Sequence, residues 1–256
     1  LTAPSAPTIT NVASTDPTNC GLVNGTITIS VTGGSGSYEY SIDNGSTWTN
    51  TTGNFTGLDA SDNPYEIKVR NAADNSCEVT GSIVNLTDKV LPTITNVVST
   101  DPTDCGVVDG TITITANGTG ALQYSIDGGG TWQASDYFDG LQAGTYEIRV
   151  RNIDGTCIVT EADEILNAPE LPVINSVTST DPTDCDTDNG TITVTATGTS
   201  IEYSIDGGTN WQATGNFTNL APGTYNIAVR NTDGTCFVLD VNNPEVLNAP
   251  SAPSIT

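Results

Sequence analysis

Residues 189–236 read NGTITVTATGTSIEYSIDGGTNWQATGNFTNLAPGTYNIAVRNTDGTC, and this stretch decides the fold. Its β-branched residues alternate with polar ones, and Gly, Asn, Asp and Pro separate the alternating runs. This pattern is typical of short strands joined by turns. Seven strands in about 80 residues indicate an immunoglobulin-like β-sandwich. We expect them at 173–177, 191–196, 201–205, around Trp211, near Phe217, at 225–230 and from Cys236 onward.

The same phrases recur along the whole chain, and a fixed period of this length is the signature of a tandem array. The segments PTITNV, PTITNV and PVINSV begin at Pro7, Pro92 and Pro172, and PSIT begins at Pro253. We predict an all-β chain of three tandem immunoglobulin-like β-sandwich domains of about 80 residues each. LTAPSAPTIT and LNAPSAPSIT at the two ends also match, so we expect the units to come from a longer array. The predicted repeats span 1–88, 89–168 and 169–248, and 249–256 starts a following repeat.

A tyrosine precedes the sixth expected strand of each repeat. It ends the phrases LQAGTY and LAPGTY in the second and third repeats, and the first repeat is two residues longer here. In a tyrosine corner, the hydroxyl bonds back to the upstream backbone and fixes this crossover. We predict such corners at Tyr65, Tyr146 and Tyr225.

The composition excludes several classes of function. The 256 residues include 6 Lys and Arg, 30 Asp and Glu and no His, for a net charge of −24. Without histidine there is no His-based acid–base catalyst, no Ser–His–Asp triad and no His-ligated zinc site. Nucleic acids and anionic membranes require a basic surface, and no apolar run reaches the length of about 18 residues that spans a bilayer. We therefore predict no catalytic residues, no enzyme activity, no nucleic-acid partner and no membrane span in this segment.

Two cysteines occupy matching positions in each repeat. There is no C-x-x-C pair of the kind that binds zinc. Paired cysteines in an acidic chain without Met or His indicate disulfides formed outside the cell. We predict an extracellular, cell-surface protein with disulfides among Cys20, Cys77, Cys105, Cys157, Cys185 and Cys236.

Two disulfide pairings are open. Pairing within repeats joins Cys20–Cys77, Cys105–Cys157 and Cys185–Cys236. In this fold, however, the two cysteines of a repeat lie at opposite ends of the sandwich, about 20 Å apart for a strand of six residues. A disulfide needs Cα atoms within about 7 Å. We therefore slightly favour the between-repeat pairs Cys20–Cys157 and Cys105–Cys236, which leave Cys77 and Cys185 for repeats outside this sequence.

A hairpin motif recurs before each tryptophan. SIDNGSTW from Ser41 and SIDGGGTW from Ser125 match the Asp-box pattern S-x-D-x-G-x-T-W of sialidase propellers, and the third repeat has Asn210 before its tryptophan. The Asp of such a turn accepts N–H bonds, and the Trp packs beneath it. We interpret the motif as a structural hairpin, with stacking of sugars on the tryptophans as the alternative. The residues are Asp43, Trp48, Asp127, Trp132, Asp206 and Trp211.

The acidic loops leave one cofactor hypothesis open. Calcium takes about six to eight oxygen ligands. If repeats stack head to tail, the loop with Asp101 and Asp104 approaches the turn with Asp233. Ca²⁺ at repeat junctions is thus possible, beside the plainer interpretation that acidic loops keep the chain soluble. We expect no other cofactor.

The ordered set of motifs resembles a known repeat. It resembles the SprB-type repeats of surface adhesins of gliding bacteria in the order of its motifs: Cys, (N/D)GTITI, YSIDGGTxW, LxxGTY and VRNxDGTC. The resemblance covers all three units. The resemblance implies secretion, surface attachment and a role in adhesion or gliding, and it brings no catalytic residues. It also implies neighbouring repeats of the same chain as partners, with other copies in a filament and surface glycans or a substratum as further partners.

The chain is therefore expected to be a structural or adhesive stalk or filament segment of a secreted bacterial surface protein. The alternatives are an array of carbohydrate-binding modules and the accessory repeats of a secreted enzyme. Saturable glycan binding by one repeat would favour the first alternative. The second requires a catalytic domain elsewhere in the protein.

Overall fold

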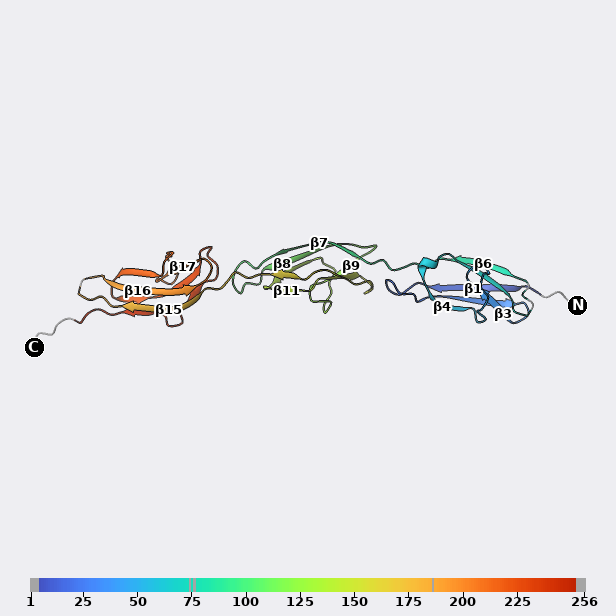
Figure 1. Ribbon diagram of the computed structural model, residues 1–256, viewed down its shortest axis with the longest axis horizontal. Helices are drawn as coiled ribbons and strands as arrows, with labels where there is room; N and C mark the ends of the chain where they lie inside the picture. Colours follow the sequence, from blue (N-terminus) through green and yellow to red (C-terminus); the bar gives the residue numbers. More distant parts are fainter. Residues whose placement is uncertain (1–4, 74, 76, 186, 252–256) are drawn as a thin grey trace, which may run out of the picture. The chain divides into compact units, whose positions relative to one another are not determined.

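A computed structural model describes residues 5–73, 75, 77–185 and 187–251 (Figure 1). Apart from a 3₁₀ turn at Ala60–Asp62, the regular elements of these residues are β-strands, which confirms the all-β prediction. None of the described helical segments is long and apolar enough to cross a membrane.

Two compact units divide the chain. One comprises Leu1–Val97, Ile114–Asp136 and Glu147–Ala162, and the other comprises Val98–Thr113, Tyr137–Tyr146 and Asp163–Thr256. The division runs through the second sequence repeat, so the repeat boundaries stay a prediction.

The first repeat forms two antiparallel sheets that enclose one core. Strand β5 (Tyr65–Asn71) is buried at every second residue, so its alternating sequence gives it one apolar face. Ile27 and Ile29 of β2 (Gly25–Gly33) share a buried cluster with Ile67 and Val69 of β5, which joins the two sheets into a sandwich. The sheets are β1(Pro7–Thr15)–β2(Gly25–Gly33)–β4(Asn54–Leu58) and β3(Tyr38–Ser41)–β5(Tyr65–Asn71)–β6(Val79–Val84) (Figure 1).

The third repeat has the same immunoglobulin-like arrangement. One buried cluster contains Ile192 and Val194 from the first of its sheets, together with Ile227 and Val229 from the segment that enters the second sheet. Its sheets are β15(Val173–Thr180)–β16(Gly190–Thr197)–β18(Asn216–Leu220), β17(Ile201–Ser204)–β20(Ala228–Asn231)–β21(Val238–Leu239) and β19(Gly223–Tyr225)–β22(Glu245–Leu247).

The second repeat contains the same strand pairings in the same chain order. Its first sheet is β7(Thr93–Thr100)–β8(Gly110–Asn117)–β10(Tyr137–Leu141). The others are β9(Leu122–Ser125)–β12(Arg149–Asn152)–β13(Val159–Thr160) and β11(Gly144–Tyr146)–β14(Glu164–Leu166). The recurring phrases thus give the same order of pairings, except that the first repeat has the single strand β5 where each of the other two has two short strands.

Two expectations for the third repeat are wrong in detail. The strand expected around Trp211 is a single bridge between Gln212 and Tyr203, because the hairpin turn occupies the preceding residues. The strand expected at 225–230 is interrupted at Ile227, whose N–H donates to the side chain of Asn243 at 2.7 Å. The side chain of Asn243 also donates to the Ile227 carbonyl at 2.8 Å, so it replaces the sheet partner where the chain changes sheets.

In each repeat, the tyrosine before the expected sixth strand forms a hydrogen bond with the backbone upstream of it. The hydroxyls of Tyr146 and Tyr225 donate to the carbonyls of Gln142 and Ala221, both at 2.8 Å. In the longer first repeat, the Tyr65 hydroxyl donates to the carbonyl of Asp59 at 2.6 Å and accepts from the N–H of the same residue. The extra residues of the first repeat are therefore absorbed without losing the bond.

Candidate functional site: the disulfide clamps

The loop between the first two strands is held by the same contacts in every repeat. The Asp of its Ser-Thr-Asp-Pro phrase accepts a bond from the backbone just beyond the last strand of that repeat, and a later Asn or Asp accepts one from a threonine N–H. The first set pairs Asp16 with Thr87, Asp101 with Asn167 and Asp181 with Asn248. The second set pairs Asn24 with Thr18, Asp109 with Thr103 and Asn189 with Thr183. The cysteine in this loop is therefore positioned alike three times.

Two disulfides join this loop to the cysteine-bearing turn of another repeat. Cys20 is bonded to Cys157, with Cα atoms 5.2 Å apart, and Cys105 to Cys236, with Cα atoms 5.0 Å apart. These are the between-repeat pairs favoured from the sequence. Cys77 and Cys185 take part in neither bond.

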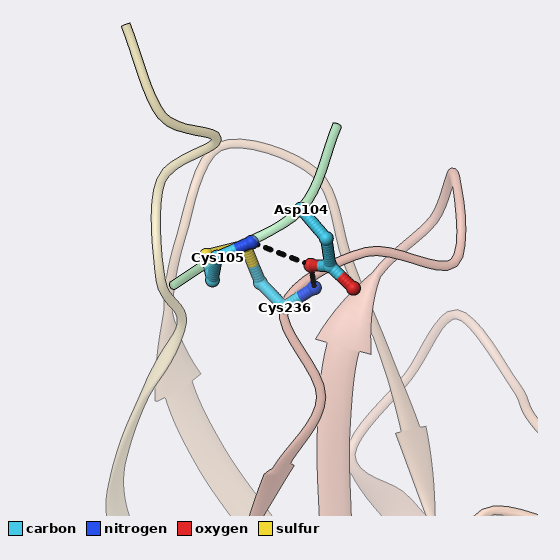
Figure 2. A group of neighbouring side chains, drawn as sticks. All are labelled: Asp104, Cys105 and Cys236. Atoms are coloured by element: carbon cyan, nitrogen blue, oxygen red, sulfur yellow. Dashed lines mark hydrogen bonds between the residues drawn. A yellow bond between two sulfur atoms is a disulfide. The ribbon is translucent and has the colours of Figure 1, made fainter. Parts of the chain in front are cut away.

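A side-chain oxygen next to each first cysteine binds both cysteine backbones. Figure 2 shows Asp104 beside the Cys105–Cys236 disulfide, where its Oδ1 accepts from both cysteine N–H groups at 2.6 Å. Asn19 does the same for Cys20 at 2.9 Å and Cys157 at 2.7 Å. Cys157 and Cys236 are each 2% exposed, so these bonds satisfy N–H groups that are shielded from water. We call each disulfide with its shared acceptor a clamp: Asn19, Cys20 and Cys157 form the first, and Asp104, Cys105 and Cys236 the second.

The turn that carries the second cysteine is also tied to the linker between repeats. The side-chain amide of Asn152 donates to the carbonyl of Val90, and that of Asn231 to the carbonyl of Glu170, both at 3.1 Å. Within the turns, Asp154 accepts from the N–H and hydroxyl of Thr156, and Asp233 does so from Thr235. The Asn-x-Asp-Gly-Thr-Cys phrase, residues 152–157 and 231–236, is thus held by bonds within the turn and to the linker, and we call it the docking turn.

Charges around the two docking turns differ. The Lys89 ammonium lies 2.7 Å from Asp154, and its hydrogen bond, with those from Thr156, lowers the pKa of the Asp154 carboxyl. Asp233 has a lowered pKa through the Thr235 bonds. The described residues lining the hollow at Asp233 include a second carboxylate, Glu170, and no lysine or arginine.

The three proposed calcium ligands each accept hydrogen bonds from the protein. Asp101 accepts from the Asn167 N–H at 2.8 Å, Asp104 belongs to the second clamp, and Asp233 accepts from Thr235. Among the described residues, one group has three or more side chains of metal-ligand type within reach of one another: Asp104, Cys105 and Cys236. Two of these are disulfide-bonded, so they offer no thiolate to a metal. Asp101 and Asp233 are not part of that group.

The Asp-box hairpin is a closed hydrogen-bond network. Asp43 accepts from the Ser41 hydroxyl at 2.6 Å and from the N–H and hydroxyl of Thr47 at 2.9 and 2.8 Å. The second repeat repeats this with Ser125, Asp127 and Thr131, and the bonds from Thr131 and then Ser125 lower the pKa of Asp127 to about 2. The carboxylates are turn acceptors.

Asn210 explains the departure of the third hairpin from the pattern. Its N–H and side-chain amide donate to Asp206 at 2.9 and 2.6 Å, as the threonine does in the other two repeats. Burial of the Asp206 carboxylate opposes ionisation, but the bonds from Asn210 and Ser204 outweigh it and lower its pKa to about 2. The network survives the substitution because the amide places a donor where the hydroxyl would be.

Each hairpin tryptophan is stacked with an arginine from the sheet. The guanidinium carbons of Arg70, Arg151 and Arg230 lie 4.2, 4.1 and 4.2 Å from the ring centroids of Trp48, Trp132 and Trp211. Arg70 and Arg230 are held by Glu39 and Glu202, and Arg151 by Gln123. One face of each ring is therefore covered by a cation, which argues against an open platform for sugars on that face.

Sequence reasoning missed the residues that support the clamps. The shared acceptors Asn19 and Asp104, the linker-binding Asn152 and Asn231, and the loop acceptor Asp101 were not assigned these roles. Their signal was recurrence at one place in every repeat, as strong as that of the cysteines. The partners of Asn152, Asp101 and Asn231 lie about 60 or more residues away along the chain, so no local pattern reveals them.

Comparison with protein families identifies a repeat in the first unit. Residues 11–47 match the family model of the SprB repeat, which confirms the resemblance predicted from the motifs. No curated protein matched the chain.

Solved structures similar to the chain are multidomain proteins. Extracellular domains 3–5 of Drosophila OTK are 13% identical, with 97% of this chain and 100% of that one covered and a TM-score of 0.32. Domains 1–6 of the surface layer protein SbsC are 14% identical, with 98% and 41% covered and a TM-score of 0.25. The FN1–FN3 domains of chicken CNTN1 are 12% identical, with 96% and 98% covered and a TM-score of 0.24. The fold assignment therefore rests on the strand pairings and the cores.

Proposed function

We propose that this chain, which carries an SprB repeat, is a load-bearing stalk segment of a secreted bacterial surface adhesin or filament. The observation that supports the proposal is the clamp: a disulfide that links the first-cysteine loop of one repeat to the second-cysteine turn of the next. The function is mechanical, and no catalytic group is assigned. The site of action is outside the cell, where disulfides persist.

The clamps limit how far the chain extends when it is pulled. The disulfides span 137 and 131 residues and overlap in sequence, since Cys105 lies before Cys157. The shortest covalent path from Cys20 to Cys236 therefore uses both disulfides and the backbone between Cys105 and Cys157. It bypasses about 160 residues, which would add roughly 55 to 60 nm if fully extended at about 3.5 Å each.

Single-molecule force spectroscopy with handles at the two ends tests this function. We expect the oxidised chain to unfold with a final contour length about 55 to 60 nm shorter than that of the reduced chain. The double variant Cys20→Ser with Cys157→Ser should recover part of the difference. Equal final lengths with and without reductant would contradict a load-bearing role for the clamps.

The alternative function, an array of carbohydrate-binding modules, would need an aromatic platform open to a sugar. The arginine-covered tryptophans give no support to sugar stacking. Binding of the whole chain to a glycan array measures this directly. Saturable binding that is lost on Trp48→Ala, Trp132→Ala or Trp211→Ala would favour the carbohydrate-binding alternative.

A further inference from the structure

We infer that the loop around Cys185 is a receiver for the docking turn, Asn-x-Asp-Gly-Thr-Cys, of another repeat of this type, which it holds through a third clamp. The inference rests on the proposed function and names the partner of one site. Cys185 is the first cysteine of the third repeat, at the position that Cys20 and Cys105 hold in the first two. Those two cysteines are each bonded to such a turn in this structure.

The loop around Cys185 shares two internal contacts with the loops around Cys20 and Cys105. Asp181 accepts from the N–H of Asn248 at 2.8 Å, and Asn189 from that of Thr183 at 2.9 Å. The matching bonds in the second repeat are Asp101 to Asn167 and Asp109 to Thr103, at 2.8 and 2.9 Å. These two contacts therefore form without a docked turn at Cys185.

The groups that grip a docking turn are present and uncovered. Asp184 stands immediately before Cys185, as Asp104 stands before Cys105, but Asp184 and Cys185 are exposed whereas Asp104 and Cys105 are half-buried. The Cys105 sulfur lies 3.2 Å from the Pro169 carbonyl, and Pro250 is the corresponding linker proline. A hollow of about 360 Å³ lies at this place, lined by Asp184, Cys185, Thr187, Asp188, Pro222, Ala249 and Pro250.

The contacts of the second clamp indicate which groups the partner's docking turn must supply. Its cysteine N–H would donate to Asp184 Oδ1, as the Cys236 N–H donates to Asp104. Its Sγ would bond to that of Cys185. Formation of this bond oxidises the two cysteine thiols, which lose two protons and two electrons. A small oxidant disulfide such as oxidised glutathione accepts both and is released as two thiols.

An extended chain tests the inference. Residues 1–250 are followed directly by a second copy of residues 170–256, so that Pro250 takes the place of Pro169. Peptide mapping without reductant should find Cys185 joined to the second copy's equivalent of Cys236, besides Cys20–Cys157 and Cys105–Cys236. Equilibration with glutathione then measures the effective concentration of the new pair.

Two substitutions at Asp184 form a matched set. Asp184→Ala removes the acceptor for both N–H groups and should lower this effective concentration about tenfold. Asp184→Asn should keep it within about twofold, because Asn19 serves the same role in the first clamp.

The outcomes separate this inference from the proposed function. A Cys185 that stays reduced, or that bonds to another molecule, would overturn the receiver. So would an added copy that fails to fold, since the same sequence folds when the second clamp holds it. An equal effect of Ala and Asn would overturn the role of Asp184. Each of these results leaves the load-bearing proposal standing, because its contour-length test depends only on the two existing disulfides.

Discussion

The two clamps share their bonds but differ in their charges. In the first, a neutral Asn19 grips both cysteines and Lys89 pairs with Asp154. In the second, an ionisable Asp104 is the acceptor, and Glu170 and Asp233 line the hollow where the first clamp has its lysine. The Cα–Cα distances are nevertheless 5.2 and 5.0 Å. The constant part is therefore a disulfide with one oxygen that accepts two backbone bonds, and the surrounding charge is the part that varies.

Removal of either disulfide should have the largest effect. Each closes a segment of more than 100 residues, for which the chain-entropy model gives about 5 kcal/mol, and measured losses are typically about 2 to 5 kcal/mol. We expect Cys105→Ser with Cys236→Ser, and Cys20→Ser with Cys157→Ser, to lower the free energy of unfolding within that range, as measured in urea. Losses below about 1 kcal/mol for both pairs would show that the clamps add little to folding.

Loss of the shared acceptor should come next. Asp104→Ala leaves the buried N–H of Cys236 without its partner, which should cost about 1 to 3 kcal/mol by urea unfolding of the oxidised chain. Asn19→Ala should behave alike in the first clamp. Asp104→Asn is the control and should stay within about 1 kcal/mol of the wild type, because an amide oxygen already does this work at Asn19. A large loss with Asp104→Asn would show that the charge, and not the geometry, is essential.

These residues also mark how far the sequence predicts the structure. The strand expected at 191–196 lies inside β16, Gly190–Thr197, because strand alternation is a local property. The interruption of the strand at Ile227 depends on Asn243, and the role of Asp101 on Asn167, which no local pattern reveals. The sequence narrows the choice between the two disulfide pairings, because the fold places the two cysteines of a repeat at opposite ends of the sandwich. It does not predict the hydrogen-bond partners of the polar turn residues, because an Asn or Asp in a turn has the same local pattern whether it binds water or a distant backbone N–H.

The Asp-box hairpins of the second and third repeats should make the stability of the chain depend on pH. The pKa of Asp127 and of Asp206 is lowered to about 2, against about 3.9 in an unfolded chain. Carboxyls with depressed pKa values stabilise the fold above the unfolded pKa, and this contribution is lost as the pH falls through the folded value. We therefore expect the free energy of unfolding to fall between about pH 4 and pH 2. Because both carboxylates are exposed, the effect should be modest.

Carboxyl NMR titration and urea unfolding across this range measure the effect. Asp127→Asn should reduce the dependence of stability on pH, since it removes one of the carboxyls with a lowered pKa. Asp139, an exposed carboxyl of the strand β10, supplies the control Asp139→Asn, which removes one surface charge outside the hairpin. A carboxyl pKa of 4 or higher at Asp127 would contradict the network described for the hairpin.

The smallest expected change in stability comes from removing the charged side chains that differ between the two clamps. Lys89→Gln removes the cation beside Asp154 and should destabilise the chain slightly at low salt. Glu170→Gln removes one of the two carboxylates near the second clamp, keeps an acceptor for the Thr199 hydroxyl, and should change stability in the opposite direction. Both shifts in urea midpoint should shrink in about 1 M salt, where the screening length is about 3 Å. Shifts of the same sign, or shifts that persist in high salt, would mean that these side chains act through packing. In that case the difference in charge between the clamps would have no energetic consequence.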